Sequence, residues 1–208
     1  MTSPPFRSAA LRYNPTAMPT PHPLPIALTY EDYLGFPDDG NRHEILEGEH
    51  TMTPAPSPDH QFVVASFLYF FRLQVREGVA YSAPIDVLLS PKTIVQPDVC
   101  YLGQDKLSRV TRRGIEGAPD IMVEILSPST SQLDEVTKRH LYAKYGVGEY
   151  WIIDLERVAV RVCTWNEAGF RPEADRLLTG ADRLTSPLAP GLDVPVVELF
   201  WSSATQRR

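Results

Sequence analysis

Three apolar segments near the middle of the chain predict strands of a β-sheet. The run "APDIMVEILS" (118–127) is apolar at both alternating sets of positions, which is typical of a strand covered on both faces. The runs "YSAPIDVLL" (81–89) and "TIVQPDVCYL" (93–102) flank "SPK" and predict an antiparallel hairpin. Pro97 cannot donate a ladder hydrogen bond, so it marks an edge or a bulge in the second of these strands.

The spacing of apolar positions and the end signals predict three helices. They cover residues 29–36, 59–76 and 133–145. Ser57 followed by Pro58 is typical of a helix start, because proline in the first turn loses no hydrogen bond. The second helix is apolar on nearly every side and is therefore expected to be mostly buried.

The remaining pattern completes an α/β (α+β) arrangement. "HEILEGEHT" (43–51) is expected to be one strand, and "EYWIIDL" (149–155) and "RVAVRVCTW" (157–165) are expected to be two more. A weaker strand surrounds Phe170, whereas residues 194–201 favour neither helix nor strand. A hairpin followed by a strand, a helix and a strand predicts a central mixed β-sheet flanked by helices.

The distribution of proline divides the chain into an arm and a domain. The 208 residues are 43% hydrophobic and 22% charged, which suits one globular domain. Seven of the 20 prolines fall in the first 25 residues, where few apolar positions repeat. We therefore expect a flexible Pro-rich arm at residues 1–27, a single domain at residues 28–201 and a C-terminal tail at residues 202–208.

Apolar content and cysteine usage restrict the compartment. No segment approaches the roughly 18 unbroken apolar residues of a membrane span, and the N-terminus lacks the apolar core of a secretory signal. A cytoplasmic location with no membrane partner is expected. Cys100 and Cys163 have no Cys or His at ligand spacing, so buried free thiols are expected instead of zinc ligands or a disulfide.

The net charge of −6 argues against a protein held on nucleic acid by bulk positive charge. Two basic segments remain, "SRVTRRG" (108–114) and "KRHLYAK" (138–144). Either they contact a phosphate backbone or they are the solvated faces of a loop and a helix.

Two carboxylates interrupt the predicted strands and need compensation. Asp98 directly follows Pro97, and Glu124 lies inside the segment 118–127. An ionised carboxylate in a covered strand costs roughly several kcal/mol unless a cation, a metal or hydrogen-bond donors offset it. Two converging oxygen ligands with waters suit a magnesium ion. The alternative is that each carboxylate pairs with an arginine or caps a loop.

One face of the third helix adds a candidate cation. Asp134, Lys138 and Tyr142 are spaced four apart and therefore share a face. Only a short turn separates this helix from the strand that carries Glu124, so the lysine is within reach of a water or phosphate beside a metal. The alternative is an ordinary Asp134–Lys138 surface pair, which contributes about 0.3–0.5 kcal/mol.

Six sequence blocks follow one another between residues 29 and 165: "HEILEGE", "PSPDHQ", "PIDVLL", "VQPDV", "GAPDIMVEILSPST" and "DEVTKRHLYAKYGVGEYWIID". In this order and spacing they resemble the Uma2 family of restriction-endonuclease-like proteins. The resemblance implies the PD-(D/E)xK nuclease fold, which is a central mixed β-sheet flanked by helices.

The resemblance also assigns residues to roles. Asp98, in "QPD", and Glu124 match the acids that bind a metal ion, which implies Mg²⁺ or Mn²⁺ as the cofactor. The general superfamily signature has a lysine two residues after the glutamate, where this chain has Leu126. Lys138 matches the lysine that the family takes from the following helix. Glu44, in "HEILEGE", matches a further acidic residue of the site.

Three more residues are expected beside this site. Gln96 is a polar neighbour of Asp98, and Asp86 is expected to lie close to Asp98 across the hairpin as an auxiliary acid. His60, in the first turn of the second helix, matches a family position and is either a structural histidine or a catalytic base.

The implied function is that of a metal-dependent endonuclease that hydrolyses phosphodiester bonds of DNA. The ion would activate a water, and Lys138 would orient that water or stabilise charge in the transition state. The alternative is a catalytically inactive nucleic-acid-binding or protein-interaction module that retains the nuclease fold. Relatives of this fold often pair, so a homodimer is compatible with the sequence, although no residue specifies its interface.

Overall fold

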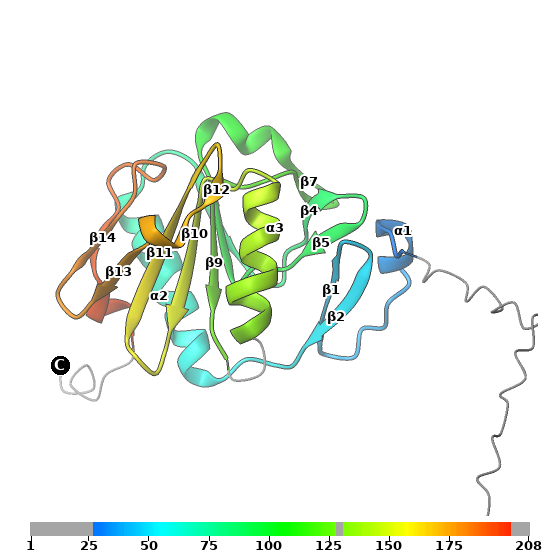
Figure 1. Ribbon diagram of the computed structural model, residues 1–208, viewed down its shortest axis with the longest axis horizontal. Coiled ribbons are helices and arrows are strands. Elements are labelled where there is room, and N and C mark those ends of the chain that lie inside the picture. The colour runs from blue at the N-terminus through cyan, green and yellow to red at the C-terminus, as the bar shows by residue number, and fades with distance from the viewer. Residues whose placement is uncertain (1–26, 128–130, 201–208) are drawn as a thin grey trace, which may run out of the picture.

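The computed structural model describes residues 27–127 and 131–200. Residues 1–26 of the expected arm, the last residue of the expected domain and the whole expected tail lie outside these ranges, so the domain boundaries stay predictions. The described residues form two large β-sheets, a small C-terminal sheet and several helices (Figure 1). The predicted mixture of α and β structure is confirmed, but the strands form two large sheets where one central sheet was expected.

The larger sheet has seven strands, in the order β12-β11-β10-β9-β6-β3 with β13 paired to β11. β9 and β10 are parallel, and the other pairs are antiparallel. All five residues of β9 are buried, which confirms the predicted strand covered on both faces. The bounds are β3 Val79–Ser82, β6 Val99–Leu102, β9 Ile121–Ile125, β10 Glu149–Asp154, β11 Ala159–Asn166, β12 Gly169–Phe170 and β13 Arg176–Thr179.

The smaller sheet has six strands, in the order β2-β1-β5-β4-β8-β7. Its bounds are β1 Arg42–Leu46, β2 Glu49–Thr53, β4 Val87–Ser90, β5 Thr93–Val95, β7 Val110–Thr111 and β8 Gly114–Glu116. β14 (Arg183–Thr185) and β15 (Asp193–Pro195) form a separate two-stranded sheet. The C-terminal segment whose pattern was ambiguous therefore begins in a strand and continues into a short helix.

The predicted hairpin at residues 81–102 is confirmed, but it belongs to both large sheets. β4 pairs with β5 in the smaller sheet, whereas β3 pairs with β6 in the larger one. Residues 96–98 belong to neither strand. Pro97 at their centre accounts for the break, because it has no N–H for a ladder hydrogen bond. Asp98 therefore lies where the chain crosses from one sheet to the other.

Residues 43–51, predicted to be one strand, belong to two strands joined by a tight turn. β1 and β2 pair antiparallel, with Leu46 opposite Glu49. The two residues between them, Glu47 and Gly48, have φ values of 54° and 89°, as a type I′ hairpin turn requires. The prediction was wrong because Glu-Gly is a weaker turn signal than Asn-Gly or Asp-Gly, so the flanking apolar residues concealed the turn.

The three predicted helices are all present. The third begins as a π-helix (η2) that continues directly into an α-helix (α3). The helical segments are α1 Tyr30–Tyr33, α2 Pro58–Gln74, η1 Gln104–Arg109, η2 Leu133–Lys138, α3 Arg139–Lys144, η3 Pro172–Ala174 and η4 Val196–Leu199.

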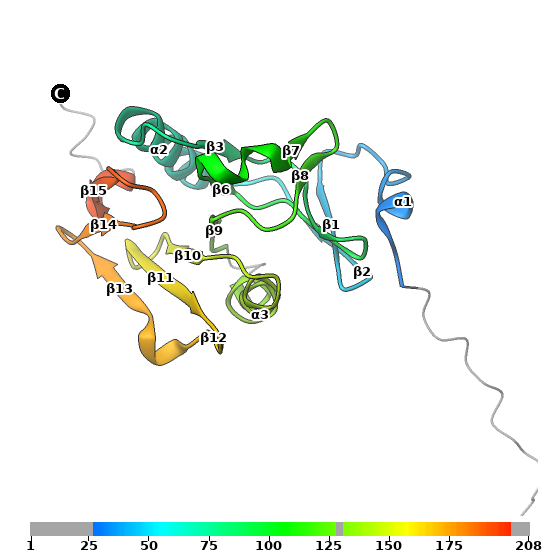
Figure 2. The same cartoon turned by 90° about the horizontal axis from the view of Figure 1, so that it is seen from above.

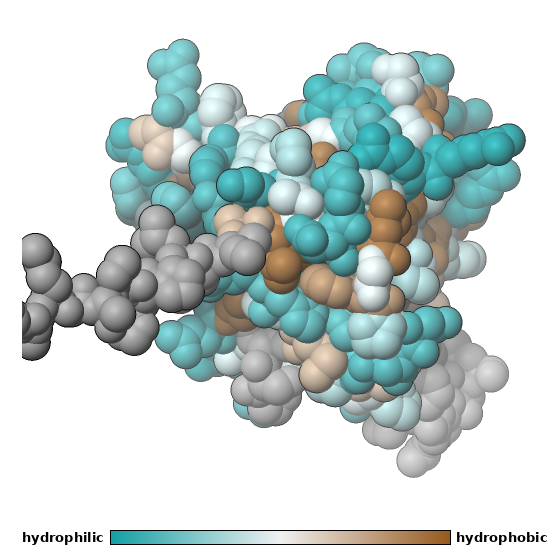
Figure 3. Space-filling model, turned by 90° about the vertical axis from the view of Figure 1, so that its right-hand side faces the viewer, coloured by the Kyte–Doolittle hydropathy of each residue, from teal (hydrophilic) through white to brown (hydrophobic). Residues whose placement is uncertain are grey.

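The two longer helical units cover opposite faces of the larger sheet, as the view from above shows (Figure 2). On one face, Phe67 of α2 belongs to the apolar cluster that contains Trp151 of β10. On the other face, Leu141 of α3 belongs to a second cluster, with Tyr150 of β10. The free thiols of Cys100 and Cys163 are buried in this second cluster, as predicted. The face of the molecule around α1 and the β1–β2 hairpin is largely hydrophilic, with small apolar patches (Figure 3).

The prediction that α2 is mostly buried was wrong. Tyr69 and Leu73 on its outer side are 60% and 63% exposed. α2 forms the outer layer of the fold, so only one of its faces packs against the sheet. The apolar side chains on its other face stay exposed.

The start of α2 provides a stability test. Ser57 Oγ accepts a hydrogen bond from the backbone N–H of His60 at 3.2 Å. Ser57→Ala is expected to lower the free energy of unfolding by about 1 kcal/mol, because this N–H loses its partner. Chemical denaturation measures the difference, with Ser108→Ala as the control because Ser108 is exposed and lies away from α2. Equal stability of the two variants would contradict the capping role.

Candidate active site

The residues predicted from the sequence meet at a small cavity where the two large sheets approach α2 and η2. Its volume is about 230 Å³. Among the residues that the sequence analysis placed in or beside the site, all except Asp86 line this cavity. They are Glu44, His60, Gln96, Asp98, Glu124 and Lys138.

Lys138 lies at the centre of three carboxylates. Its Nζ donates a hydrogen bond to Glu124 Oε1 at 3.0 Å, and it lies 3.0 Å from Glu44 Oε2 and 3.7 Å from Asp134 Oδ1. These acids come from β9, β1 and η2, so the cluster joins both sheets to the helix. The interpretation of Asp134 and Lys138 as a surface pair is wrong, because the two residues are only 3% and 4% exposed.

The helix that carries Lys138 presents one polar face to β9. Asp134, Lys138 and Tyr142 lie on this face, as their spacing predicted. Tyr142 donates from its hydroxyl to Glu124 Oε1 at 2.7 Å, a role that the sequence interpretation did not assign to it. The face begins in the π-helical segment η2, and single π-helical turns are frequent at functional sites.

Burial and an excess of acidic groups shift the pKa values of this cluster. Burial alone would lower the pKa of Lys138, but the negative charges of Glu124, Glu44 and Asp134 outweigh it and raise the pKa. Burial raises the pKa of Glu124 to about 8; the charge of Lys138 opposes this shift, and those of Asp98 and the two other acids add to it. The cluster therefore holds more acidic groups than cations, and Glu124 takes up a proton near neutral pH.

Asp98 accepts hydrogen bonds from three parts of the chain. Oδ1 accepts from Arg42 Nη1 at 2.6 Å, and Oδ2 accepts from His60 Nε2 at 3.0 Å and from the backbone N–H of Ile125 at 2.8 Å. The last contact brings Asp98 beside Glu124, the preceding residue of β9. Burial alone would raise the pKa of Asp98, but the hydrogen bond and charge of His60 and the charge of Arg42 lower it.

The contact with Asp98 also constrains His60. An ionised carboxylate can only accept, so Nε2 of His60 carries a hydrogen. His60 is 6% exposed, and within the described ranges its Nδ1 has no hydrogen-bond partner. This environment fits the structural alternative for His60, and its role as a catalytic base stays a prediction.

Gln96 connects the cavity to a neighbouring polar network. Its backbone N–H donates to Glu44 Oε1 at 2.7 Å, while its side-chain amide donates to Tyr33 Oη at 2.8 Å and to Asp86 Oδ1 at 2.9 Å. Tyr33 in turn donates to Asp86 Oδ1 at 2.6 Å. Asp86, expected close to Asp98 across the hairpin, is held by Tyr33 and Gln96 and does not line the small cavity.

Arg42 is a site residue that the sequence interpretation missed. β1 begins at Arg42, one residue before the predicted strand. Arg42 therefore lies two positions from Glu44 on the same face of β1, and this period-two spacing was the available signal. The alternative that a strand carboxylate pairs with an arginine is confirmed for Asp98.

Several cations of the two basic segments contact other groups of the protein. Lys138 is buried, and Arg113, Arg139 and Lys144 contact aromatic or acidic side chains. Arg112 is exposed. The contacts are Arg113 over the ring of Tyr30 (4.4 Å to the centroid), Arg139 with Asp175 (2.7 Å) and Lys144 with Glu47 (2.6 Å).

The donor set restricts the kind of metal that the cavity suits. Over residues 27–127 and 131–200, no group of three or more His, Cys, Asp or Glu side chains is arranged to hold a metal ion. Mg²⁺ is commonly bound through one or two carboxylates, with waters and substrate phosphates as the other ligands. Asp98 and Glu124 supply two hard oxygen donors beside an excess of negative charge, so the residues present fit Mg²⁺ or Mn²⁺.

The mixed sheets, the flanking helices and the acidic cavity define a protein of the restriction-endonuclease-like class. The model of the Uma2 family, described as "Putative restriction endonuclease", matches residues 30–197. The chain belongs to this family.

A solved structure supports the fold assignment. It is the crystal structure of a protein described as "a putative nuclease belonging to DUF820" from Anabaena variabilis ATCC 29413. The TM-score is 0.69 at 21% sequence identity, and the match covers 83% of this chain and 97% of that chain. No curated protein sequence matches this chain. None of the described helices is both long and apolar enough to span a membrane.

Proposed function

We propose that this protein is a metal-dependent endonuclease that hydrolyses phosphodiester bonds of DNA. Asp98 and Glu124 would hold Mg²⁺ or Mn²⁺, and Lys138 would act on the water or on the transition state. The observation that carries the proposal is that these three side chains line one cavity, although they come from a sheet crossing, a central strand and a helix.

The balance of charge supports a cation at this position. Around Lys138 there is one ammonium group and three carboxylates, those of Glu44, Glu124 and Asp134. A divalent cation beside Asp98 and Glu124 would offset this excess. When bound, the ion would polarise the phosphate and lower the pKa of an attacking water.

The residues of the chain would divide the remaining work. The ammonium group of Lys138 is held by its carboxylates, so it provides a fixed positive charge for the developing charge on the phosphate. Arg42 and His60 hold Asp98 in one orientation. Glu44 accepts the backbone N–H of Gln96 through Oε1, which leaves Oε2 to position Lys138 or a water.

A second function is favoured by a different observation. Asp98 already pairs with Arg42, and Glu124 already pairs with Lys138, so both carboxylates are compensated without a metal. The alternative is therefore a catalytically inactive nucleic-acid-binding or protein-interaction module that retains the nuclease fold.

Calorimetry and a cleavage assay separate the two functions. For a nuclease, Mg²⁺ or Mn²⁺ is expected to bind the wild type and not Asp98→Ala, and plasmid or oligonucleotide cleavage is expected to require the ion and to stop with EDTA. Nucleic-acid binding that is indifferent to metal, with no cleavage, would support the inactive module and reject the nuclease.

The raised pKa of Glu124 predicts a pH-dependent metal affinity. The ion binds the ionised carboxylate, so a proton competes for Glu124 below its pKa of about 8. The affinity for Mg²⁺ is expected to rise by about tenfold per pH unit as the pH approaches this value and to level off above it. Titration calorimetry at a series of pH values measures the change, and Glu124→Gln, which cannot ionise here, is the control. A constant affinity between about pH 6 and 8 would reject the assignment of Glu124 as a ligand.

A further inference from the structure

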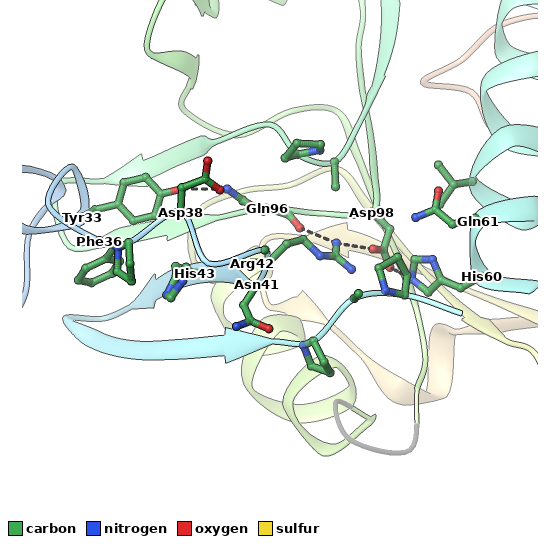
Figure 4. A pocket seen from close by; sticks show the side chains of 18 of the residues that line it. Tyr33, Phe36, Asp38, Asn41, Arg42, His43, His60, Gln61, Gln96 and Asp98 are labelled. Carbon is green, nitrogen blue, oxygen red and sulfur yellow. Dashed lines mark hydrogen bonds and ion pairs between the residues drawn. The ribbon is translucent and has the colours of Figure 1, made fainter. Parts of the chain in front are cut away.

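A second and larger cavity adjoins the small acidic one. Its volume is about 540 Å³, which lies in the range of ligand-binding pockets. Arg42, Asp98 and His60 form a hydrogen-bonded chain at the border between the cavities (Figure 4). The residues that line both cavities are Arg42, Pro54, Ala55, Pro56, His60, Gln96 and Asp98.

The walls of the larger cavity combine aromatic rings with side-chain amides. In Figure 4, Tyr33 and Phe36 lie at one end, and Gln61 lies at the other end, on α2. Within the ranges that the structure describes, the side-chain amide of Gln61 makes no hydrogen bond. The side-chain amide of Asn41 interacts with the carboxylate of Asp39, which also accepts the backbone N–H of Asn41. Each amide offers a donor and an acceptor, the combination with which Asn and Gln contact base edges. Aromatic rings offer a face on which a base stacks.

Arg42 lies at the border of the two cavities, and only one of its donor nitrogens contacts the described residues. Its Nη1 makes both of its hydrogen bonds, to Asp98 Oδ1 at 2.6 Å and to the backbone oxygen of Gln96 at 3.4 Å. Among the described residues, its Nη2 and Nε have no hydrogen-bond partner. The side chain is 18% exposed. A guanidinium group with a free edge suits a phosphate group.

The rest of the surface does not favour a duplex. The net charge is −6, and three cations of the two basic segments, Arg113, Arg139 and Lys144, contact other groups of the protein. Duplex DNA carries one negative charge per roughly 1.7 Å of its axis and is bound largely through many phosphate contacts. A paired base cannot enter a cavity, whereas an unpaired or flipped base can.

We propose that the larger cavity binds the base of one unpaired nucleotide whose phosphate lies beside Arg42, so that the substrate is single-stranded or locally unpaired nucleic acid. Asn41 and Gln61 contact the edge of the base in this arrangement. Tyr33 and Phe36 contact its face or rim. The inference rests on the proposed function, because the phosphate at Arg42 is the one presented to Asp98 and Glu124.

Binding measurements without cleavage test this site. The probes are a short labelled DNA strand, the RNA strand of the same sequence and the DNA duplex, with Ca²⁺ in place of Mg²⁺. Fluorescence anisotropy is expected to show that the wild type binds a single strand about tenfold more tightly than the duplex. Gln61→Leu and Asn41→Leu are each expected to weaken single-strand binding by about tenfold. The matched control is Gln104→Leu, an exposed glutamine on η1 outside both cavities, with unchanged binding.

Competition identifies the part of the nucleotide that is recognised. Deoxyadenosine monophosphate is expected to displace the strand at a concentration about tenfold lower than deoxyribose 5-phosphate, because only the former carries a base. Equal affinity for strand and duplex, equal competition by the two phosphates, or equal losses in Gln61→Leu and Gln104→Leu would each overturn the base site.

The base site and the nuclease proposal fail in different ways. Cleavage of duplex and single strand at equal rates would overturn the base site and leave the nuclease intact. Selective single-strand binding that depends on Gln61, in a wild type that cleaves nothing with Mg²⁺ or Mn²⁺, would support the base site and reject the nuclease.

Discussion

Asp98→Asn and Glu124→Gln are each expected to reduce the rate of metal-dependent cleavage by at least about 10²-fold. Removal of one group that stabilises charge in a transition state typically lowers kcat by this factor. Each substitution keeps the shape of the side chain and removes the charge that a divalent ion requires. The loss should appear in kcat at saturating substrate, because the ion acts on the reacting phosphate and the attacking water.

The comparison needs a carboxylate that the site does not use. Asp154 at the end of β10 accepts hydrogen bonds from Arg157 and does not line the small cavity. Asp154→Asn should therefore cleave at the wild-type rate. Thermal unfolding of all variants identifies any loss that comes from misfolding. If folded Asp98→Asn and Glu124→Gln cleave as fast as Asp154→Asn, the catalytic assignment is wrong.

Lys138→Met is expected to lower the free energy of unfolding by about 3–5 kcal/mol, the usual consequence of removing one partner from a buried ion pair. The methionine side chain fills a similar volume, but Glu44, Glu124 and Asp134 would then have no cation among them. Chemical denaturation near neutral pH measures the loss. Cleavage should also fall, because the fixed positive charge at the phosphate is gone.

The direction of the pH dependence distinguishes charge from packing. Without Lys138 the buried acids can avoid repulsion by taking up protons, so the folded state would bind protons more strongly than the unfolded state. The stability deficit of Lys138→Met should therefore be smaller near about pH 5 than near about pH 8. The double variant Lys138→Met/Glu124→Gln should recover part of the loss at about pH 8, because one uncompensated charge is removed. A deficit that is independent of pH and unchanged in the double variant would indicate lost packing instead.

Much of the local structure could be predicted from the sequence. Pro97 marked the break in the hairpin, the doubly apolar pattern identified β9, and Ser57 with Pro58 marked the start of α2. These signals work because a missing N–H, strand alternation and a helix cap act over a few neighbouring residues. The β1–β2 turn was not predicted, because Glu-Gly is a weaker turn signal than Asn-Gly or Asp-Gly.

The candidate site could be predicted from the sequence only in part. The spacing of Asp134, Lys138 and Tyr142 placed them on one helix face, and the two interrupting carboxylates were visible as exceptions in apolar strands. The partners of these carboxylates were not visible. Arg42 and Asp98 are 56 residues apart in the chain, and His60 and Asp98 are 38 apart, so no local period connects them.

By itself, the sequence determined where the long helices and the central strands lie, and it showed that two acids interrupt apolar strands. Only the tertiary structure decided how deeply Lys138 is buried, which cations hold Asp98, and which groups contact the cations of the basic segments. It also decided that two cavities share a border. The physical reason is distance along the chain: hydrophobic periodicity is a local property, whereas the compensation of a buried charge depends on groups that meet only when the sheets and helices pack.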